Sequence, residues 1–231
     1  YGADALRMTL ITGNAPGNDM RFYWERVENS RNFANKIWNA SRFTLMNLDV
    51  TENKLPDLND LQLEDKWILS KLNSLIEFVD SSLGNYVITE PARAMAEFTD
   101  ELSNWYVRRG RERYWAPGME ADKVAAYMTL YTALVTIAKT AAPMVPFLAE
   151  EIYQNLVRSI DKTAPESIHL CDFPTVEEKW IDKELESKMD EIIRIVELGR
   201  AARNGANRKN RQPLAEMYVK ACLLYTSDAA D

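Results

Sequence analysis

Apolar residues recur every three or four positions along most of the 231-residue chain, which is the spacing of amphipathic helices. This pattern predicts helices over residues 25–48, 63–83, 89–115, 122–140 and 185–207. Pro143 and Pro146 predict a break after the fourth of these helices, because proline lacks the amide proton that a helix interior needs. A further helical piece is expected through residues 147–157. The expected fold class is all-α, an antiparallel helix bundle.

The segments between the helices carry weaker signals. Thr89 is expected to cap the third helix, with Pro91 in its first turn. Two short strands are predicted, "ESIHLCDF" at residues 166–173 and "LAEMYVK" at residues 214–220. The last ten residues, 222–231, resemble the translation of a sequencing-library adapter and are interpreted as a non-native tail.

Composition excludes several classes of function. The chain is 46% hydrophobic and 27% charged, which favours a folded core over disorder. One His and two Cys without CxxC spacing do not make a metal site, so no metal ligand is assigned. No GxGxxG, P-loop or GxSxG motif occurs, so no catalytic residue or cofactor is assigned. The apolar stretch at residues 135–149 is too short and too interrupted by proline to span a membrane.

Positive charge gathers at residues 104–115, "NWYVRRGRERYW", although the chain carries a formal charge of -7. Arginines and aromatic rings together are what an unpaired RNA loop requires, because cations contact phosphates and flat rings stack on bases. The candidate RNA-binding residues are Arg108, Arg109, Arg111 and Arg113 for phosphates or bases, and Tyr106, Tyr114 and Trp115 for stacking.

A helical wheel adds a constraint on this segment. Trp105 lies between Phe98 and Leu102 on the apolar face and is therefore assigned to the core. Arg109 and Arg113 fall on the same face, where an arginine is not buried without a partner. Either the end of the helix projects beyond the core, or acidic partners await these side chains.

A second basic cluster contains Arg200, Arg203, Arg208 and Arg211, with no acid between Leu198 and Ala215. It predicts secondary phosphate contacts. Basic residues on the first long helix, Arg26, Arg31, Lys36 and Arg42, are interpreted as an ordinary polar face.

Three other interpretations of these features remain open. The arginines at residues 108–113 also suit a solvated helix end, where they complement the helix dipole. Arg, Trp and Tyr are also favoured at the centre of protein interfaces, so a helical protein–protein scaffold is a second alternative. A complete small enzyme is the third, although no convergent catalytic set supports it.

Several long motifs in order carry a family resemblance: "YGADALR", "RNFANKIWNASRF", "DKWILSKLN" and "AAPMVPFLAEEIYQNLV". Across residues 1–221 the chain resembles the C-terminal part of a class I aminoacyl-tRNA synthetase of the isoleucine, valine and leucine subgroup. The resemblance implies that residues 1–20 end the ATP-binding catalytic domain and that residues 21–175 form the anticodon-binding bundle. Residues 176–221 would be a connecting helix and the start of a C-terminal α/β domain.

The resemblance also implies a partner and cofactors. The partner would be tRNA, with no DNA and no membrane, in the cytoplasm. The longer protein would use ATP and Mg²⁺. The HIGH and KMSKS signatures are absent from these residues, so the chain alone is expected to be inactive in amino-acid activation.

Two amino-acid specificities are mixed in the motifs. Residues 1 to about 70 resemble valyl-tRNA synthetase, whereas "DELSNWYVRRGRERYW" and "LGRAARNGANRKNRQPLAEMYVKA" resemble isoleucyl-tRNA synthetase. The isoleucine enzyme is therefore expected, with valine as the alternative. A chimera joined near residues 63–75 is expected as well, and a naturally mixed sequence is its alternative.

Overall fold

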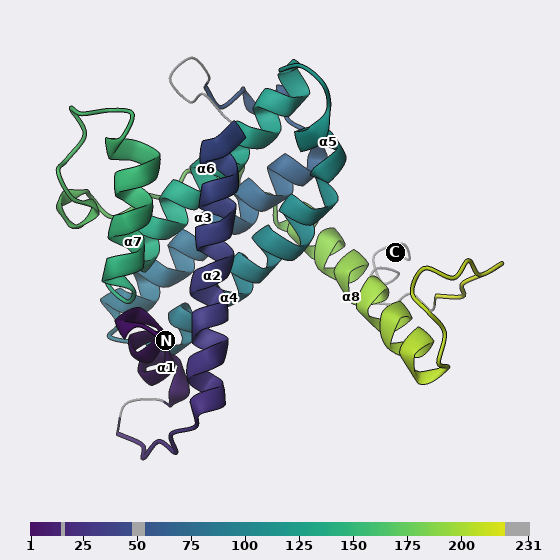
Figure 1. The fold of residues 1–231 in the computed structure, drawn as a ribbon, viewed down its shortest axis with the longest axis horizontal. Coiled ribbons are helices and arrows are strands. Elements are labelled where there is room, and N and C mark those ends of the chain that lie inside the picture. The colour runs from purple at the N-terminus through teal and green to yellow at the C-terminus, as the bar shows by residue number, and fades with distance from the viewer. Residues whose placement is uncertain (15–16, 48–53, 220–231) are drawn as a thin grey trace, which may run out of the picture. The chain divides into compact units, whose positions relative to one another are not determined.

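The computed structural model describes residues 1–14, 17–47 and 54–219 (Figure 1). The chain divides into two compact units, residues 1–182 and 183–231. A strand is expected at residues 214–220, but residues 214–219 form none, so this prediction is wrong for them. Residue 220 lies outside the described residues. The tail at residues 222–231 lies outside them as well.

The described residues contain helices and no strand, so the expected all-α fold class is confirmed. The first unit contains α1 (Ala3–Gly13), α2 (Trp24–Asn47), α3 (Leu63–Gly84), α4 (Thr89–Glu101), α5 (Arg111–Trp115), α6 (Ala121–Ala141) and α7 (Pro146–Tyr153). Two π-helical segments, η2 (Leu102–Val107) and η3 (Gln154–Arg158), extend α4 and α7. Three short 3₁₀ turns are η1 (Leu58–Asp60), η4 (Ile168–Leu170) and η5 (Glu178–Trp180), and the second unit begins with α8 (Lys183–Gly205).

The core of the first unit forms around α3 and α6. Ile68 and Val79 of α3, and Leu130 and Leu134 of α6, have no exposed surface. By length and composition α6 could cross a membrane, but 67% of its apolar window is buried inside the protein. That burial is what a central helix of a bundle needs, because neighbouring helices cover it on several sides.

Prolines and caps account for two of the helix boundaries. Pro146 is the first residue of α7, where its missing amide proton costs nothing, so the predicted break is confirmed. The prediction for Thr89 is wrong, because the cap of α4 is Ile88 and Thr89 lies inside the helix. The Thr89 hydroxyl lies 3.0 Å from the Ile11 carbonyl oxygen and 3.2 Å from that of Asn14, so it ties α4 to the end of α1.

The strand predicted at residues 166–173 is also wrong, because this segment bends around the η4 turn. Glu150 of α7 accepts hydrogen bonds from the Ser167 hydroxyl at 2.7 Å and the Ile168 amide at 3.0 Å. These bonds hold the backbone on α7, where the Ile168 side chain is buried. Although partial burial raises the pKa of Glu150, its hydrogen bonds from Ser167, Gln154 and Ile168 bring that pKa below the ordinary value.

Candidate nucleic-acid interface

A wide π turn lies at the centre of the predicted RNA-binding segment. Residues Leu102–Val107 form η2, in which the neighbouring side chains of Trp105 and Tyr106 are both buried. Burial of Trp105 agrees with its assignment to the core. Because a π turn has more residues than an α turn, it changes the phase of the helix, and Arg109 after it is exposed rather than on the apolar face.

Arg113 meets acidic partners, which is the second of the two alternatives that its place on the wheel left open. Its two terminal nitrogens donate to the Asp65 carboxylate, at 2.9 Å to Oδ1 and 2.7 Å to Oδ2. Its Nε and Nη2 also donate to Asp122, at 3.0 and 2.8 Å. Asp65 is fully buried, whereas the Arg113 side chain is 19% exposed. Such a bidentate pair fixes the position of the guanidinium, so Arg113 is a structural link between α3, α5 and α6.

Asp65 also organises the buried groups around it. Its second role is in the capping box of α3, where the Gln62 amide donates to Oδ2 at 3.2 Å. The Tyr106 hydroxyl donates to Oδ1 at 2.5 Å, with the Ala126 carbonyl oxygen 3.1 Å away. Three separate donors therefore satisfy one buried carboxylate, which is the arrangement that a buried charge needs.

The pKa values in this cluster follow from burial and from Asp65. Burial raises the pKa of Tyr106 well above the ordinary tyrosine value, and the neighbouring Tyr114 and Asp65 raise it further. Burial alone would lower the pKa of Arg113, but its hydrogen bonds to Asp65 and Asp122 outweigh this and raise it. Tyr106 therefore remains protonated and Arg113 remains charged at neutral pH.

Tyr114 lies in an aromatic cluster and not on the surface. Its ring makes edge contacts with Phe43 of α2 and Tyr127 of α6, at centroid distances of 5.3 and 4.8 Å. Gly110 allows this packing, because a Cβ there would lie 3.0 Å from both the Tyr106 carbonyl oxygen and Tyr114 Cε2. Tyr106 and Tyr114 are both buried, so the expectation that their rings are open to RNA bases is wrong.

The remaining predicted residues of this segment are open to solvent. Arg108, Arg109 and Arg111 are exposed, and the Trp115 ring is 70% exposed. The Arg111 guanidinium carbon lies over that ring, 5.7 Å from its centroid. We call these four residues, Arg108, Arg109, Arg111 and Trp115, the α5 surface. It offers three cations and one flat ring on a short stretch of backbone, so it is suited to phosphates and to one unpaired base.

The second basic cluster lies in the second unit, where α8 ends in a Schellman motif. Asn207 has a positive φ of 51°, and the Arg208 amide donates to the Arg203 carbonyl oxygen at 2.8 Å. The Arg203 guanidinium donates to the Gln212 carbonyl oxygen at 2.7 Å and to two neighbouring carbonyl oxygens at 3.3 Å. Arg203 therefore holds the turn that follows α8, while the side chains of Arg200, Arg208 and Arg211 are exposed.

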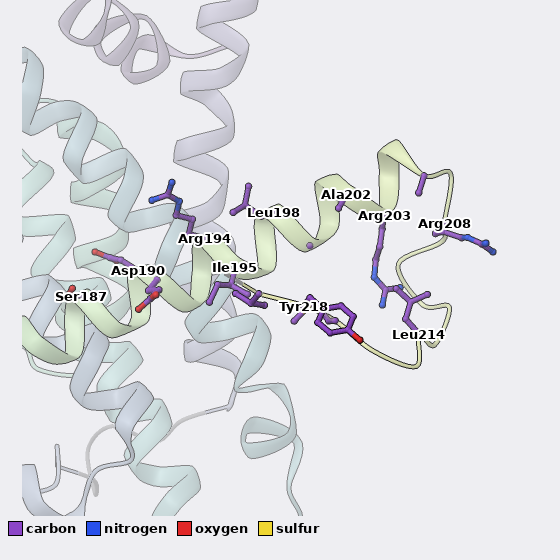
Figure 2. A pocket seen from close by; sticks show the side chains of 15 residues that line it. Ser187, Asp190, Arg194, Ile195, Leu198, Ala202, Arg203, Arg208, Leu214 and Tyr218 are labelled. Atoms are coloured by element: carbon purple, nitrogen blue, oxygen red, sulfur yellow. The ribbon is translucent and has the colours of Figure 1, made fainter. Parts of the chain in front are cut away.

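A groove of about 820 Å³ opens between α8 and residues 214–219, which run back along this helix (Figure 2). Apolar side chains from both sides line it, including Ile195, Leu198, Leu214 and Tyr218. Arg203 and Arg208 lie at the end of α8 beside this apolar lining. The cluster predicted from charge thus adjoins an exposed apolar face that the charge pattern does not indicate.

The described residues contain no group of three His, Cys, Asp or Glu side chains that could hold a metal ion. Asp65 and Asp122, the two carboxylates that face Arg113, are both bonded to it. The described residues therefore do not fit the Mg²⁺ site that the family resemblance implies for the longer protein.

Most of the chain matches a known class of domain. The family model for the anticodon-binding domain of tRNA ligase matches residues 65–219, so the chain belongs to this family. It is 51% identical to an isoleucine–tRNA ligase of Clostridium novyi and 50% identical to that of Clostridium tetani, over 94% of this chain and 21% of each relative. The chain thus spans about a fifth of the length of these curated relatives.

Solved structures share the fold at low sequence identity. The LeuRS of Agrobacterium radiobacter, solved as a ternary complex with tRNA and LeuAMS, aligns with a TM-score of 0.61 and 17% identity, over 79% of this chain and 20% of that chain. The apo methionyl-tRNA synthetase of Mycobacterium tuberculosis aligns with a TM-score of 0.54 and 18% identity, over 75% and 39%. These likenesses concern the helical fold alone.

The relatives also bear on the expected chimera. The alignment with the Clostridium novyi ligase runs over 222 residues and leaves only a few per cent of this chain unmatched. It therefore includes most of residues 1–70, which resemble the valine enzyme, together with the segment that follows them. One isoleucine–tRNA ligase accounts for both parts, so the similarity requires no junction near residues 63–75.

Proposed function

We propose that this chain binds the anticodon stem-loop of a tRNA through the α5 surface. The observation that carries the proposal is the separation of roles within one segment. Arg113, Tyr106 and Tyr114 build the core, while Arg108, Arg109, Arg111 and Trp115 are left open. Membership of the anticodon-binding family supplies the class of RNA. The exposed Arg200, Arg208 and Arg211 of the second unit would add phosphate contacts.

We further propose that the longer protein ligates isoleucine to its tRNA. The support is the identity of about 50% to isoleucine–tRNA ligases over nearly the whole chain. ATP and Mg²⁺ would bind in parts of such a protein outside this chain. The protein would act in the cytoplasm, where tRNA serves translation. The 231 residues alone are expected to show no isoleucine- or valine-dependent pyrophosphate exchange.

The test is a titration of the chain with synthetic RNA hairpins that carry the isoleucine or the valine anticodon loop. We expect binding to the isoleucine hairpin, and we expect this binding to weaken steeply between low and moderate salt, because phosphate contacts release counterions. Preference for the valine hairpin would reverse the assigned specificity.

Binding to neither hairpin would contradict the proposal. The alternative, a protein–protein scaffold, is favoured by the exposed apolar residues along α8 and the segment after it. A desolvated protein interface would depend much less on salt than RNA binding does.

A further inference from the structure

Trp115 lies at a point where the backbone is held on both sides. Two residues before it, Arg113 is bonded to Asp65 and Asp122. Immediately after it, the Ala116 carbonyl oxygen accepts a hydrogen bond from Lys123 Nζ at 2.8 Å. The backbone is thus fixed from α3 and α6, while the Trp115 ring between these anchors is 70% exposed.

A tryptophan that is exposed on a fixed backbone offers a flat ring that a stacking ligand can cover. A large aromatic side chain gains most from burial, and the neighbouring Tyr114 is in fact buried in the core. Holding the backbone beforehand lowers the entropy that is lost when the ring becomes ordered on binding. The Arg111 guanidinium lies over one face of the ring and adds a cation next to the stack.

We propose that Lys123, Asp122 and Asp65 are positioning residues that hold Trp115 as a rigid stacking platform for one unpaired RNA base. Asp65 and Asp122 act through Arg113, and Lys123 acts through the Ala116 carbonyl oxygen. None of the three needs to touch RNA. The proposal rests on the proposed function, and it names the residues that prepare the α5 surface for an unpaired loop.

Lys123 offers the cleanest test, because its hydrogen bond ends on a backbone carbonyl oxygen. Lys123→Met removes that bond and keeps the apolar part of the side chain. Replacing Asp65 would instead disturb the core, since Asp65 is fully buried. Lys139→Met is the matched control: Lys139 is a half-buried lysine near the other end of α6.

The experiment is a double-mutant cycle on affinity for the isoleucine anticodon hairpin, using the whole chain. We expect Trp115→Ala to weaken binding about tenfold, the size of one base–aromatic stack, and Trp115→Phe to retain most of the affinity. Lys123→Met should weaken binding by about threefold, and it should add no further loss in the Trp115→Ala background. Lys139→Met should leave the affinity unchanged.

The salt dependence separates positioning from direct contact. If Lys123 acts only through the platform, Lys123→Met leaves the slope of log affinity against log salt unchanged. A slope reduced by the amount expected for about one phosphate, or an equal loss in the Trp115→Ala background, would mean that Lys123 touches the RNA and would overturn the proposal. An unchanged affinity in Trp115→Ala would overturn it as well. If the unaltered chain does not bind the hairpin, the proposed function itself fails.

Discussion

Arg113 and Asp65 join through two parallel hydrogen bonds of 2.9 and 2.7 Å, although they are 48 positions apart in the chain. This pair links the start of α3 to the end of α5, next to the exposed arginines. Its bidentate geometry explains why a cation occurs on the apolar face of its helix. The pair also divides the arginines of the segment into one that builds the fold and three that remain open.

Removing the Asp65 carboxylate should destabilise the first unit strongly. Asp65→Ala leaves the Arg113 guanidinium partly buried with Asp122 as its remaining acidic partner, and it also removes the nearer of the two acceptors of the Tyr106 hydroxyl. Breaking a buried pair in this way costs about 3–5 kcal/mol of unfolding free energy. Urea unfolding measures the loss. Lys36→Met, which breaks the more exposed pair with Asp100, is the control and should cost less than about 1 kcal/mol.

The close packing at Gly110 yields a second prediction. A Cβ there would lie 3.0 Å from a backbone oxygen and from the buried Tyr114 ring, neither of which moves freely. Gly110→Ala should therefore cost about 1–3 kcal/mol of unfolding free energy. Gly84→Ala at the end of α3 is the matched control, because no atom lies within 4 Å of its added Cβ. Equal stability of the two variants would contradict this close packing.

The buried tyrosines predict a loss of stability in alkali. The pKa of Tyr106 is raised in the folded state by burial first, so the folded chain keeps its proton when the unfolded chain has begun to lose it. The stabilisation is complete below the ordinary tyrosine pKa of about 10 and is lost as pH rises above it. Burial raises the pKa of Tyr114 in the same direction.

Urea midpoints at about pH 8 and about pH 11 measure this effect. The midpoint of the unaltered chain should fall more than that of Tyr106→Phe, because phenylalanine has no proton to lose. Tyr86→Phe is the control, since the Tyr86 side chain is 91% exposed. A fall as steep in Tyr106→Phe as in the unaltered chain would contradict the prediction.

Much of the fold is predictable because the periodicity of apolar residues is a local property. The helix predicted at residues 63–83 is α3, Leu63–Gly84, and the helix predicted at residues 122–140 is α6, Ala121–Ala141. The wheel also indicates that Arg113 either projects beyond the core or has an acidic partner. It cannot name Asp65, because the partner of a side chain depends on how distant helices pack.

The errors arise where tertiary contacts or a change of helical pitch override local preference. The residues at 166–173 alternate like a strand, but the hydrogen bonds to Glu150 hold them in a turn. Tyr114 is expected from the sequence at an exposed helix end, but the aromatic rings of Phe43 and Tyr127 enclose it. The π turn of η2 shifts the phase that a regular wheel assumes, which is why Arg109 is exposed whereas Arg113 is paired.

The last prediction concerns the number of phosphates that the α5 surface binds. Arg108→Gln, Arg109→Gln and Arg111→Gln each remove one exposed cation. Each should weaken binding of the anticodon hairpin and lower the slope of log affinity against log salt by about 0.7–0.9 for every phosphate that is no longer neutralised. Lys179→Gln is the control, because Lys179 is already paired with Glu177 and lies over the Trp180 ring. Hairpin titrations at several salt concentrations give all four slopes. An unchanged slope in the three arginine variants would show that these cations do not meet phosphates, and it would favour a protein partner for the α5 surface.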